Sequence, residues 1–328
     1  MSTIDYYFWR REAALVYAWG DMRQNKWSRR EWLAGATAAA ALGAPQGKKS
    51  AMTDQGYIDA HVHVWTPDTQ RYPRPRNEQY APTSFTPEEL LAHARPCGVT
   101  RVVLIQMSFY GTDNRYMLDA IAHYPGVFSG VGIVDHNAPG VADEMRRLKR
   151  LGVRGFRITP GGQPQTWLDA PGMAAMWKCG AEERMAMCPL VDSDALAAIG
   201  RMCARHPETP VVIDHLARIG ADGQIRDAAV RQLCDLARHT QVHVKVSAFY
   251  ALGKKQYPYT DLAGLIQRVL EAYGPERLMW ATDCPFQVQN GHTYAGSLEL
   301  VRDRLDFLSA HDREWLLRGT AARVFFAA

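Results

Sequence analysis

The chain has 328 residues, of which 47% are hydrophobic and 22% are charged, so it is globular and long enough to bury a sizeable core in one large domain or in two. The formal net charge is only +4, and no stripe of lysine and arginine alternates with aromatic residues, which argues against a nucleic-acid-binding protein. The six cysteines form no Cys-x-x-Cys pair and are too sparse for a disulfide framework, so we expect reduced thiols in the core.

The N-terminal part of the chain, residues 1–50, differs in composition from the rest. Residues 28–33 read Ser-Arg-Arg-Glu-Trp-Leu and precede an apolar stretch of small residues, 34–44, that is too short to span a bilayer unaided. This segment resembles a twin-arginine export signal. We therefore expect an N-terminal extension that directs the protein to the periplasm without stable membrane insertion, and translation can start at Met1 or at Met22. The alternative is a cytoplasmic protein with an alanine-rich tail.

The first predicted strand carries two histidines. Residues 57–64 read Tyr-Ile-Asp-Ala-His-Val-His-Val, an apolar run typical of a β-strand. Because side chains alternate along a strand, His61 and His63 project from the same side. One interpretation is a pair of half-buried histidines that bond to their neighbours. The other is an enzyme in which both histidines act on one metal ion or one carbonyl group.

From residue 57 onward the chain repeats a short apolar run, a polar junction and an amphipathic stretch of helical period. The predicted strands are 57–64, 101–106, 128–134, 153–158, 186–191, 210–215, 242–247 and 278–283. The predicted helices are 87–95, 114–123, 141–151, 173–184, 194–205, 228–239 and 262–273, with further helical stretches from 297. Eight strand–helix units predict a (β/α)₈ TIM barrel as a single domain over residues 56–328. A doubly wound open sheet fits less well, because no Gly-rich phosphate loop follows the first strand.

Polar residues gather at the carboxyl ends of the predicted strands, where the active sites of such barrels lie. They are His61, His63, Arg154, Arg157, Asp192, Asp214, His215, Lys245, Ser247 and Asp283. Each also has a structural interpretation, as a helix cap, a surface ion pair or a satisfied hydrogen-bonding group. We interpret Asp192 as a helix cap because a serine and a predicted helix follow it, whereas Cys-Pro-Phe after Asp283 argues against a cap there. We therefore predict one inward-facing catalytic cluster, formed by His61, His63, His215 and Asp283.

Five segments together resemble a known family. They are DAHVHVW at 59–65, YGTDN at 110–114, GVRGFR at 152–157, VIDH at 212–215 and TDCP at 282–285. By these motifs the chain resembles the amidohydrolase superfamily, and within it the amidohydrolase-related group that holds 2-pyrone-4,6-dicarboxylate lactonase and the sugar-lactone and sulfomuconolactone hydrolases. The resemblance covers residues 56–326. Cys284 stands where the family usually has a tryptophan.

The resemblance implies a hydrolase that opens a lactone with an acidic substituent. In the mechanism that it implies, Asp283 takes a proton from a water molecule that attacks the lactone carbonyl. Hydrogen bonds to the carbonyl oxygen then come from His61, His63 and His215. Arginines hold the acidic substituent, because their planar fork of donors matches a carboxylate or sulfonate. The predicted substrate-binding residues are Arg157, Arg154, Tyr110 and Ser247.

The resemblance also bears on metal binding. Metal-dependent members usually add a carboxylated lysine or a glutamate on strand four, or a histidine after strand five, to the histidines of strand one and the aspartate of strand eight. Here strand four offers arginines, and strand five ends in Pro-Leu-Val-Asp. We therefore expect that no cofactor is required. The alternative is one divalent metal, zinc or manganese, bound by His61, His63 and Asp283, with His215 as a fourth ligand or just outside the ligand set.

Three functions compete at this point. The favoured one is hydrolysis of a small-molecule lactone. The second is a metal-dependent decarboxylase or amide hydrolase of the same superfamily, which stoichiometric zinc or manganese after purification would indicate. The third is a non-catalytic binding or scaffold protein, against which the complete set of three histidines and one aspartate argues. The sequence predicts a small-molecule partner and no nucleic acid, and it leaves the oligomeric state and the identity of the lactone open.

Overall fold

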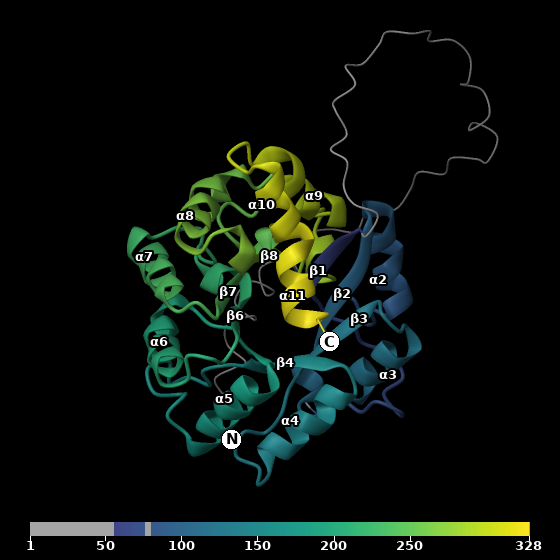
Figure 1. Ribbon diagram of the computed structural model, residues 1–328. Helices are drawn as coiled ribbons and strands as arrows, with labels where there is room; N and C mark the ends of the chain where they lie inside the picture. The colour runs from purple at the N-terminus through teal and green to yellow at the C-terminus, as the bar shows by residue number, and fades with distance from the viewer. Residues whose placement is uncertain (1–55, 76–79, 328) are drawn as a thin grey trace, which may run out of the picture. The chain divides into compact units, whose positions relative to one another are not determined.

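The computed structural model describes residues 56–75 and 80–327. Eight strands lie in one sheet in chain order, each parallel to the next. They are β1 (Tyr57–Val62), β2 (Val99–Ile105), β3 (Phe128–Gly132), β4 (Val153–Ile158), β5 (Ala186–Pro189), β6 (Val211–Ile213), β7 (Val242–Val246) and β8 (Leu278–Trp280). A bridge between Val62 and Cys284 joins β1 to the segment after β8, so the sheet closes into the predicted (β/α)₈ barrel (Figure 1). The predicted extension of residues 1–50 lies outside the described residues.

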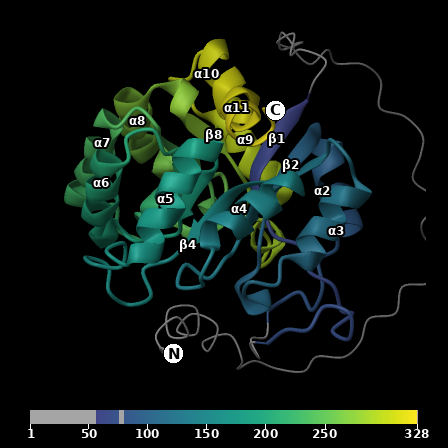
Figure 2. The ribbon, with the colours of Figure 1, turned by 60° about the horizontal axis from the view of Figure 1, so that its bottom comes forward.

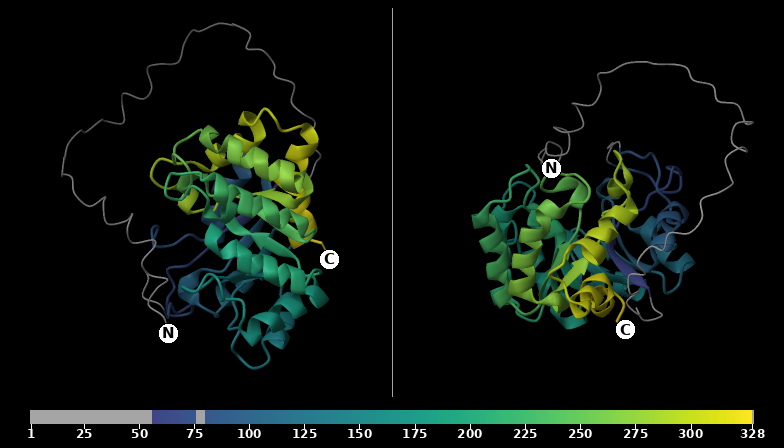
Figure 3. Two further views of the ribbon diagram at one scale, coloured as in Figure 1. Left: turned by 90° about the vertical axis from the view of Figure 1, so that its left-hand side faces the viewer. Right: turned by 90° about the horizontal axis from the view of Figure 1, so that it is seen from above.

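In the described parts of the chain, one α-helix lies between each pair of consecutive strands, and three follow β8. They are α2 (Pro87–Ala94), α3 (Arg115–His123), α4 (Val141–Arg150), α5 (Pro171–Glu183), α6 (Leu196–Arg205), α7 (Asp227–Asp235), α8 (Ala263–Tyr273), α9 (Tyr294–Glu299), α10 (Ala310–Glu314) and α11 (Thr320–Phe325). Figures 2 and 3 show these helices on the outside of the strands. None of the helices in the described part of the chain is long and apolar enough to cross a membrane.

Local sequence signals fix where helices begin, as α2 illustrates. The side chain of Thr86 accepts a hydrogen bond from the backbone N of Glu89, and the Glu89 carboxylate accepts one from the backbone N of Thr86 at 2.6 Å. This reciprocal pair satisfies two amide groups that a helix start leaves free. Pro87 follows in the first turn, where its missing N–H costs nothing. The helix then packs Leu90 and Leu91 against the barrel.

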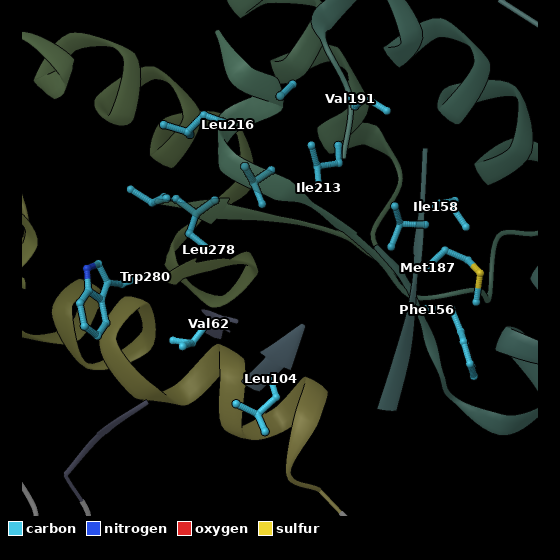
Figure 4. Packing of buried hydrophobic residues seen from close by; sticks show 14 of the residues in the cluster. Val62, Leu104, Phe156, Ile158, Met187, Val191, Ile213, Leu216, Leu278 and Trp280 are labelled. Carbon is cyan, nitrogen blue, oxygen red and sulfur yellow. The ribbon is translucent and has the colours of Figure 1, made fainter. Parts of the chain in front are cut away.

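The alternation of side chains along the strands produces two apolar layers. The outer layer lies between strands and helices and includes Val62, Leu104, Phe156, Ile213 and Trp280 (Figure 4). The inner layer lies within the barrel and comprises Ile58, Ala60, Val103, Ile105, Val131, Ala186, Cys188, Val212, Met279 and Ala281, with Ala321 and Phe325 from α11. Because apolar side chains fill this part of the interior, the polar chemistry is confined to the carboxyl ends of the strands.

A β-bulge in β1 changes which side chains face inward. Asp59 pairs with Val102 and Val62 pairs with Leu104, so β1 has one residue more than β2 over this interval. An extra residue shifts the alternation by one position. Ala60 therefore belongs to the inner layer, and the next residue, His61, also contacts residues inside the barrel. Without the bulge, strict alternation from Ala60 would direct both histidines of β1 outward.

Candidate active site

The four residues of the predicted cluster lie together at the carboxyl ends of β1, β6 and β8. His61 Nε2 lies 3.2 Å from His63 Nε2 and 3.5 Å from Asp283 Oδ1. His63 Nε2 lies 3.3 Å from the same carboxylate oxygen, and His215 Nε2 lies 3.8 Å from Asp283 Oδ2. Each of these side chains is at most 7% exposed. The predicted residues thus form one buried cluster.

Two of these residues follow strands that end earlier than predicted. β6 and β8 contain three residues each, and the chain turns soon after them. His215 has φ 52° and Asp283 has φ 66°, both in the left-handed region. For a residue other than glycine this conformation costs about 1–3 kcal/mol and persists only where the surroundings hold it. It brings the His215 ring to a centroid distance of 4.3 Å from the ring of His61.

Asp283 has one bound and one unbound carboxylate oxygen. Tyr250 OH donates a hydrogen bond to Oδ2 at 2.6 Å, whereas the buried Oδ1 has no hydrogen-bond partner. Burial alone would raise the pKa of Asp283, but the neighbouring histidines, His215 first, stabilise the carboxylate and hold this pKa below its usual value. Burial, followed by the charge of Asp283, raises the pKa of Tyr250 well above its usual value, so the phenol keeps its proton. Asp283 is therefore ionised at neutral pH, with Oδ1 able to accept a proton.

The tautomer of His63 follows from its backbone contact. Its Nδ1 lies 2.9 Å from the carbonyl oxygen of Ile105, which can only accept, so Nδ1 carries the proton. In the neutral ring Nε2 is then an acceptor, and it faces Asp283 Oδ1. With its proton on Nδ1, a neutral His63 has no donor at Nε2 for the predicted hydrogen bond to a substrate carbonyl. His63 Nε2 and Asp283 Oδ1 can instead accept the two protons of one water molecule.

His61 lies between two cations. Lys245 Nζ lies 3.1 Å from Nδ1, and Arg157 Nη2 lies 3.0 Å from Nε2. A neutral imidazole accepts at only one nitrogen. Both cations have Asp214 as a further acceptor, Arg157 at Oδ2 and Lys245 at Oδ1, so His61 accepts from one of them, either at Nδ1 from Lys245 with its proton on Nε2 or at Nε2 from Arg157 with its proton on Nδ1. Burial, and next the charge of Lys245, hold the pKa of His61 well below its usual value, which keeps the ring neutral.

Asp214 balances these two cations. Its Oδ1 lies 2.9 Å from Lys245 Nζ, its Oδ2 lies 3.0 Å from Arg157 Nη2, and Asp214 and Lys245 are almost fully buried. Burial would raise the pKa of Asp214, but Lys245, His61 and Arg157 together hold it well below its usual value. A buried ion must be paired to be tolerated, and here two cations pair with one carboxylate. Asp214 thus anchors both cations beneath His61.

Ser247 sets the orientation of His215. Its hydroxyl lies 2.8 Å from Nδ1 and 3.4 Å from the carbonyl oxygen of Lys245, and its single proton can go to either of them. When it goes to Nδ1, the proton of His215 lies on Nε2, the nitrogen nearest to Asp283. Burial lowers the pKa of His215 to about 4, so the ring is neutral at neutral pH. Ser247 therefore acts through His215, which offers an N–H donor to the site.

The cluster also fits a divalent cation. The Nε2 atoms of His61 and His63 and Oδ1 of Asp283 lie 3.2–3.5 Å apart, close to the separation of about 3.3 Å between ligand atoms of a tetrahedral zinc ion. His61, His215 and Asp283 also offer ligand atoms that lie within 4.8 Å of one another. The unpartnered Oδ1 agrees with such a role. This arrangement requires the His61 proton on Nδ1, facing Asp214 Oδ1 at 3.3 Å, and it places the ion beside the Arg157 guanidinium.

The remaining predicted residues divide between the cluster and other places. Arg157 joins the cluster, with a side chain that is 11% exposed. Arg154 does not, because its guanidinium group donates to the carbonyl oxygens of Lys149, near the end of α4, and of Val153, the first residue of β4. Tyr110 is buried, and its hydroxyl accepts a hydrogen bond from the backbone N of Thr66 at 3.3 Å.

Asp192 does not act as the predicted helix cap. It occupies the first position before a short 3₁₀ turn, Ser193–Ala195, but its side chain makes no capping hydrogen bond. The carboxylate lies instead 3.5 Å from Nη1 of Arg218, a residue that follows His215 closely in the chain. The Asp192 carboxylate thus forms an ion pair with Arg218 in place of the capping hydrogen bond.

Three residues of the site received no predicted role. Lys245 and Asp214 were visible as polar residues at strand ends, and a lysine inside the apolar strand Val-His-Val-Lys-Val was a usable signal. Tyr250 lies in the loop after β7, in a 3₁₀ turn of residues Phe249–Ala251, where no periodicity indicates its direction. Its role appears only from its contact with Asp283.

Comparisons with known proteins agree with this geometry. The amidohydrolase family model matches residues 58–327. The chain is similar to 4-sulfomuconolactone hydrolase of Rhizobium radiobacter, with 28% identity over 232 residues that span 70% of this chain and 76% of the relative. It is 27% identical to L-fucono-1,5-lactonase of Burkholderia ambifaria over 241 residues, 72% of this chain and 82% of the relative. It is also 27% identical to 2-pyrone-4,6-dicarboxylate hydrolase of Comamonas testosteroni over 241 residues, 70% of this chain and 77% of the relative.

Solved structures give the same grouping. A Pseudomonas putida protein provisionally named 2-pyrone-4,6-dicarboxylic acid hydrolase has a TM-score of 0.70 at 27% identity, covering 83% of this chain and 98% of that one. An amidohydrolase of Burkholderia multivorans with bound zinc has a TM-score of 0.68 at 22% identity, covering 83% of this chain and 99% of that one. The second likeness establishes a shared fold.

Proposed function

The chain belongs to the amidohydrolase family and is a hydrolase, and from this premise we propose that it opens a lactone that carries an acidic substituent. The proposal rests on the environment of the Asp283 carboxylate. Its buried Oδ1 has no hydrogen-bond partner and lies within 3.5 Å of two histidine nitrogens, while Tyr250 holds its other oxygen. Such a carboxylate suits the activation of a water molecule.

The proposed reaction has two steps. In the first, Asp283 Oδ1 accepts a proton from water as the water oxygen bonds to the lactone carbonyl carbon, and the carbonyl oxygen becomes negative. His61 and His215 donate to this oxygen from Nε2. In the second, the carbonyl re-forms, the bond to the ring oxygen breaks, and this oxygen takes the proton from Asp283. The product is a hydroxy acid, and the carboxylate returns to its ionised form.

The neighbouring side chains keep each group in its role. Lys245 donates to His61 Nδ1 and so fixes the Nε2 proton as a donor to the substrate. Tyr250 holds Asp283 Oδ2, which leaves the other oxygen for water. His63 Nε2 accepts the second proton of the same water as a hydrogen bond and orients it. No metal ion is required in this scheme.

Arg157 is the proposed contact for the acidic substituent. Its Nη2 is bound to Asp214, but its buried Nε has no hydrogen-bond partner. The side chain is 11% exposed, so a ligand can reach part of the guanidinium group. A carboxylate or sulfonate at the exposed part of this group would accept charge-assisted hydrogen bonds from it. Arg154 and Tyr110 are left out of this proposal because their side chains bond elsewhere.

A second candidate function is that of a metal-dependent decarboxylase or amide hydrolase. The spacing of the His61, His63 and Asp283 ligand atoms favours it. These residues would hold zinc or manganese, with His215 adjacent, and the ion would polarise a carbonyl or lower the pKa of a bound water molecule. The guanidinium of Arg157, 3.0 Å from His61 Nε2, opposes a dication at this position, so we favour the reaction without metal.

A pH-indicator screen tests the proposal. Purified protein is offered lactones of aromatic breakdown and sugar lactones, each with and without an acidic group, before and after dialysis against chelator. We expect acid release from an acidic lactone that survives chelation. Because the pKa of Asp283 lies below its usual value, its carboxylate is ionised above about pH 4, so kcat should be flat from about pH 5 to 8 with no metal–water step near 7. Loss of activity on chelation, restored one-to-one by zinc or manganese, would reassign the cluster as metal ligands.

We further propose that residues 1–50 direct export to the periplasm through the twin-arginine pathway. The Arg-Arg pair at 29–30 and the apolar stretch 34–44 support this proposal. Replacing Arg29 and Arg30 by lysine should retain the protein in the cytoplasm of a native host while the wild type reaches the periplasm. Equal fractionation of both proteins would contradict the proposal.

A further inference from the structure

Asp59 is a buried carboxylate that the proposed reaction does not use. We propose that Asp59 is a positioning residue, which joins β1 to the segment after β8 and thereby sets the relative placement of His61, His63 and Asp283. The proposal rests on the proposed function, because the positioned atoms are those of the proposed base and its neighbours. Asp59 does not touch the substrate in this proposal, yet the reaction requires it.

The carboxylate of Asp59 accepts four hydrogen bonds. Oδ1 accepts from the backbone N of His61 at 3.1 Å and from the backbone N of Thr282 at 3.0 Å. Oδ2 accepts from Thr282 Oγ1 at 2.5 Å and from Tyr294 OH at 2.7 Å. The side chain is fully buried. A buried carboxylate is costly unless its lone pairs are satisfied, and here all four are used.

These bonds lie where the barrel closes, between β1 and the segment after β8. Every other neighbouring pair of strands is joined by the sheet, but β1 and the segment after β8 share an isolated bridge. Two backbone hydrogen bonds accompany that bridge, from His63 N to Cys284 O and from Asp283 N to His61 O, at 2.8 and 2.9 Å. One residue earlier, the backbone N of Thr282 has the side chain of Asp59 as its acceptor. Asp59 thus supplies a link that the backbone does not.

The same carboxylate supports the bulge that turns the histidines inward. The extra residue of β1 lies between Asp59 and Val62, and the backbone N of His61 within this interval donates to Asp59 Oδ1. A bulge leaves its extra residue outside the regular ladder, so a side-chain acceptor stabilises it. Asp59 Oδ1 therefore binds the backbone N of His61 and the backbone N of Thr282, the residue before Asp283, at the same time.

The geometry of the reaction depends on this link. His61 and His63 approach Asp283 Oδ1 from β1, whereas Asp283 follows β8. A displacement of about 1 Å between reacting groups can reduce turnover about 10²-fold without preventing substrate binding. Loosening the seam, by which we mean the junction between β1 and the segment after β8, should therefore lower kcat and leave KM nearly unchanged. A residue that only stabilised the fold would change the melting temperature and leave kcat of the folded fraction intact.

The test compares two replacements of Asp59 on an acidic lactone that the wild type hydrolyses. In Asp59→Asn, the amide oxygen can still accept from both backbone N–H groups, and the amide nitrogen can donate to the hydroxyls of Thr282 and Tyr294, which rotate to accept. We expect kcat within about tenfold of wild type for Asp59→Asn and a loss of about 10²-fold for Asp59→Ala, with KM within about threefold in both. Asp119→Ala is the matched control, because Asp119 also accepts from a tyrosine, Tyr72, but on the exposed surface of α3.

Two further measurements keep the outcomes distinct. If Asp59→Ala does not fold, the double variant Thr282→Val with Tyr294→Phe removes both donors to Oδ2, and kcat should fall about tenfold at constant KM. Because Thr282 Oγ1 also accepts from the backbone N of Cys284, Tyr294→Phe alone is measured beside it and should show a smaller fall of kcat in the same direction. Crystal structures of the variants should show a lengthened distance between His61 Nε2 and Asp283 Oδ1, a readout that needs no substrate. If the wild type is active and kcat is unchanged in a folded Asp59→Ala, or in the double variant, the positioning role of Asp59 is overturned. If the wild type hydrolyses none of the lactones, the proposed function is overturned instead. In that case the positioning role is still tested, because an unchanged distance between His61 Nε2 and Asp283 Oδ1 in Asp59→Ala would refute it.

Discussion

Two buried carboxylates lie within a few ångströms of His61, and their partners give them different roles. Asp214 is paired with cations on both sides, Lys245 and Arg157. Asp283 accepts a hydrogen bond from a tyrosine at one oxygen and has no hydrogen-bond partner at the other. The pKa of each lies below its usual value, so both are ionised at neutral pH. Neither Asp214 Oδ1 nor Asp283 Oδ1 has a hydrogen-bond partner, but Asp214 Oδ1 lies 2.9 Å from the Lys245 ammonium group, whereas Asp283 Oδ1 faces histidine rings. We therefore assign Asp283 as the base and Asp214 as the anchor.

Asp283→Asn tests this assignment directly. An amide cannot accept the water proton at neutral pH, so kcat should fall on the order of 10²-fold or more, the usual scale for a general base. The amide still accepts from Tyr250 and should leave the fold intact. Steady-state kinetics and circular dichroism of the purified variant provide the measurement. Turnover within a factor of a few of wild type would remove Asp283 from the mechanism.

Arg157→Met separates substrate binding from structural support. If the guanidinium group holds an acidic substituent, KM should rise at least tenfold for acidic lactones and stay within about twofold for neutral ones. Arg154→Met is the matched control, because Arg154 lies on the same strand and donates only to backbone carbonyls in its described contacts. Equal changes in KM for both lactone classes would show that Arg157 serves only to anchor Asp214.

At the scale of the elements, the strand repeat and the cluster could be predicted, but the exact direction of the side chains could not. The alternation rule correctly placed His61 and His63 together, yet they face inward because of a bulge whose extra residue depends on the pairing with β2. Both Arg154 and Arg157 were predicted to bind the substrate, Arg157 as the stronger candidate, and only Arg157 reaches the site. The contact between Lys245 and His61 spans 184 positions in the chain, so no local pattern reveals it.

A buried histidine of β7 allows the pH dependence of the stability of the barrel to be tested. His243 is 5% exposed and pairs with Val212 of β6. Burial, and next the charge of Arg323, lower its pKa to about 4. The folded state thus disfavours protonation, whereas the unfolded chain binds a proton below about pH 6.5. Stability from this group is complete above pH 6.5 and is lost as the pH falls toward 4, by at most about 3 kcal/mol.

Urea unfolding at pH 7 and pH 5 measures this contribution. The loss of stability between the two values should be smaller in His243→Gln than in wild type, by about 1–2 kcal/mol. His311→Gln, at an exposed position on α10, should leave the difference unchanged. His215, whose pKa is also lowered to about 4, adds a similar dependence that both variants retain. An identical pH dependence in wild type and His243→Gln would mean that His243 titrates normally in the folded barrel.

At the scale of the whole molecule, the elements that hold the site all lie within the segment matched by the family model, residues 58–327. The seam between β1 and β8 is held by Asp59 and Thr282, and α11 places Phe325 in the inner layer at the other end of the chain. The first strand and the last helix are therefore both needed for one barrel. Residues 53–328 also form one compact unit by themselves.

A chain that begins at Thr53 should therefore fold and act as the full chain does. The described contacts that position the proposed base and the histidines lie within residues 56–327, so we expect kcat and KM within about twofold of the full chain and a melting temperature within about 2 °C. The matched control removes α11 by ending the chain at Gly319, which takes Phe325 out of the inner layer and should destabilise the barrel by about 3–5 kcal/mol, the cost of deleting a buried aromatic side chain. Limited proteolysis, calorimetry and kinetics on both truncations make the comparison. If the chain from Thr53 lost activity or stability to the same extent as the chain without α11, residues 1–52 would have to be counted as part of the folded enzyme.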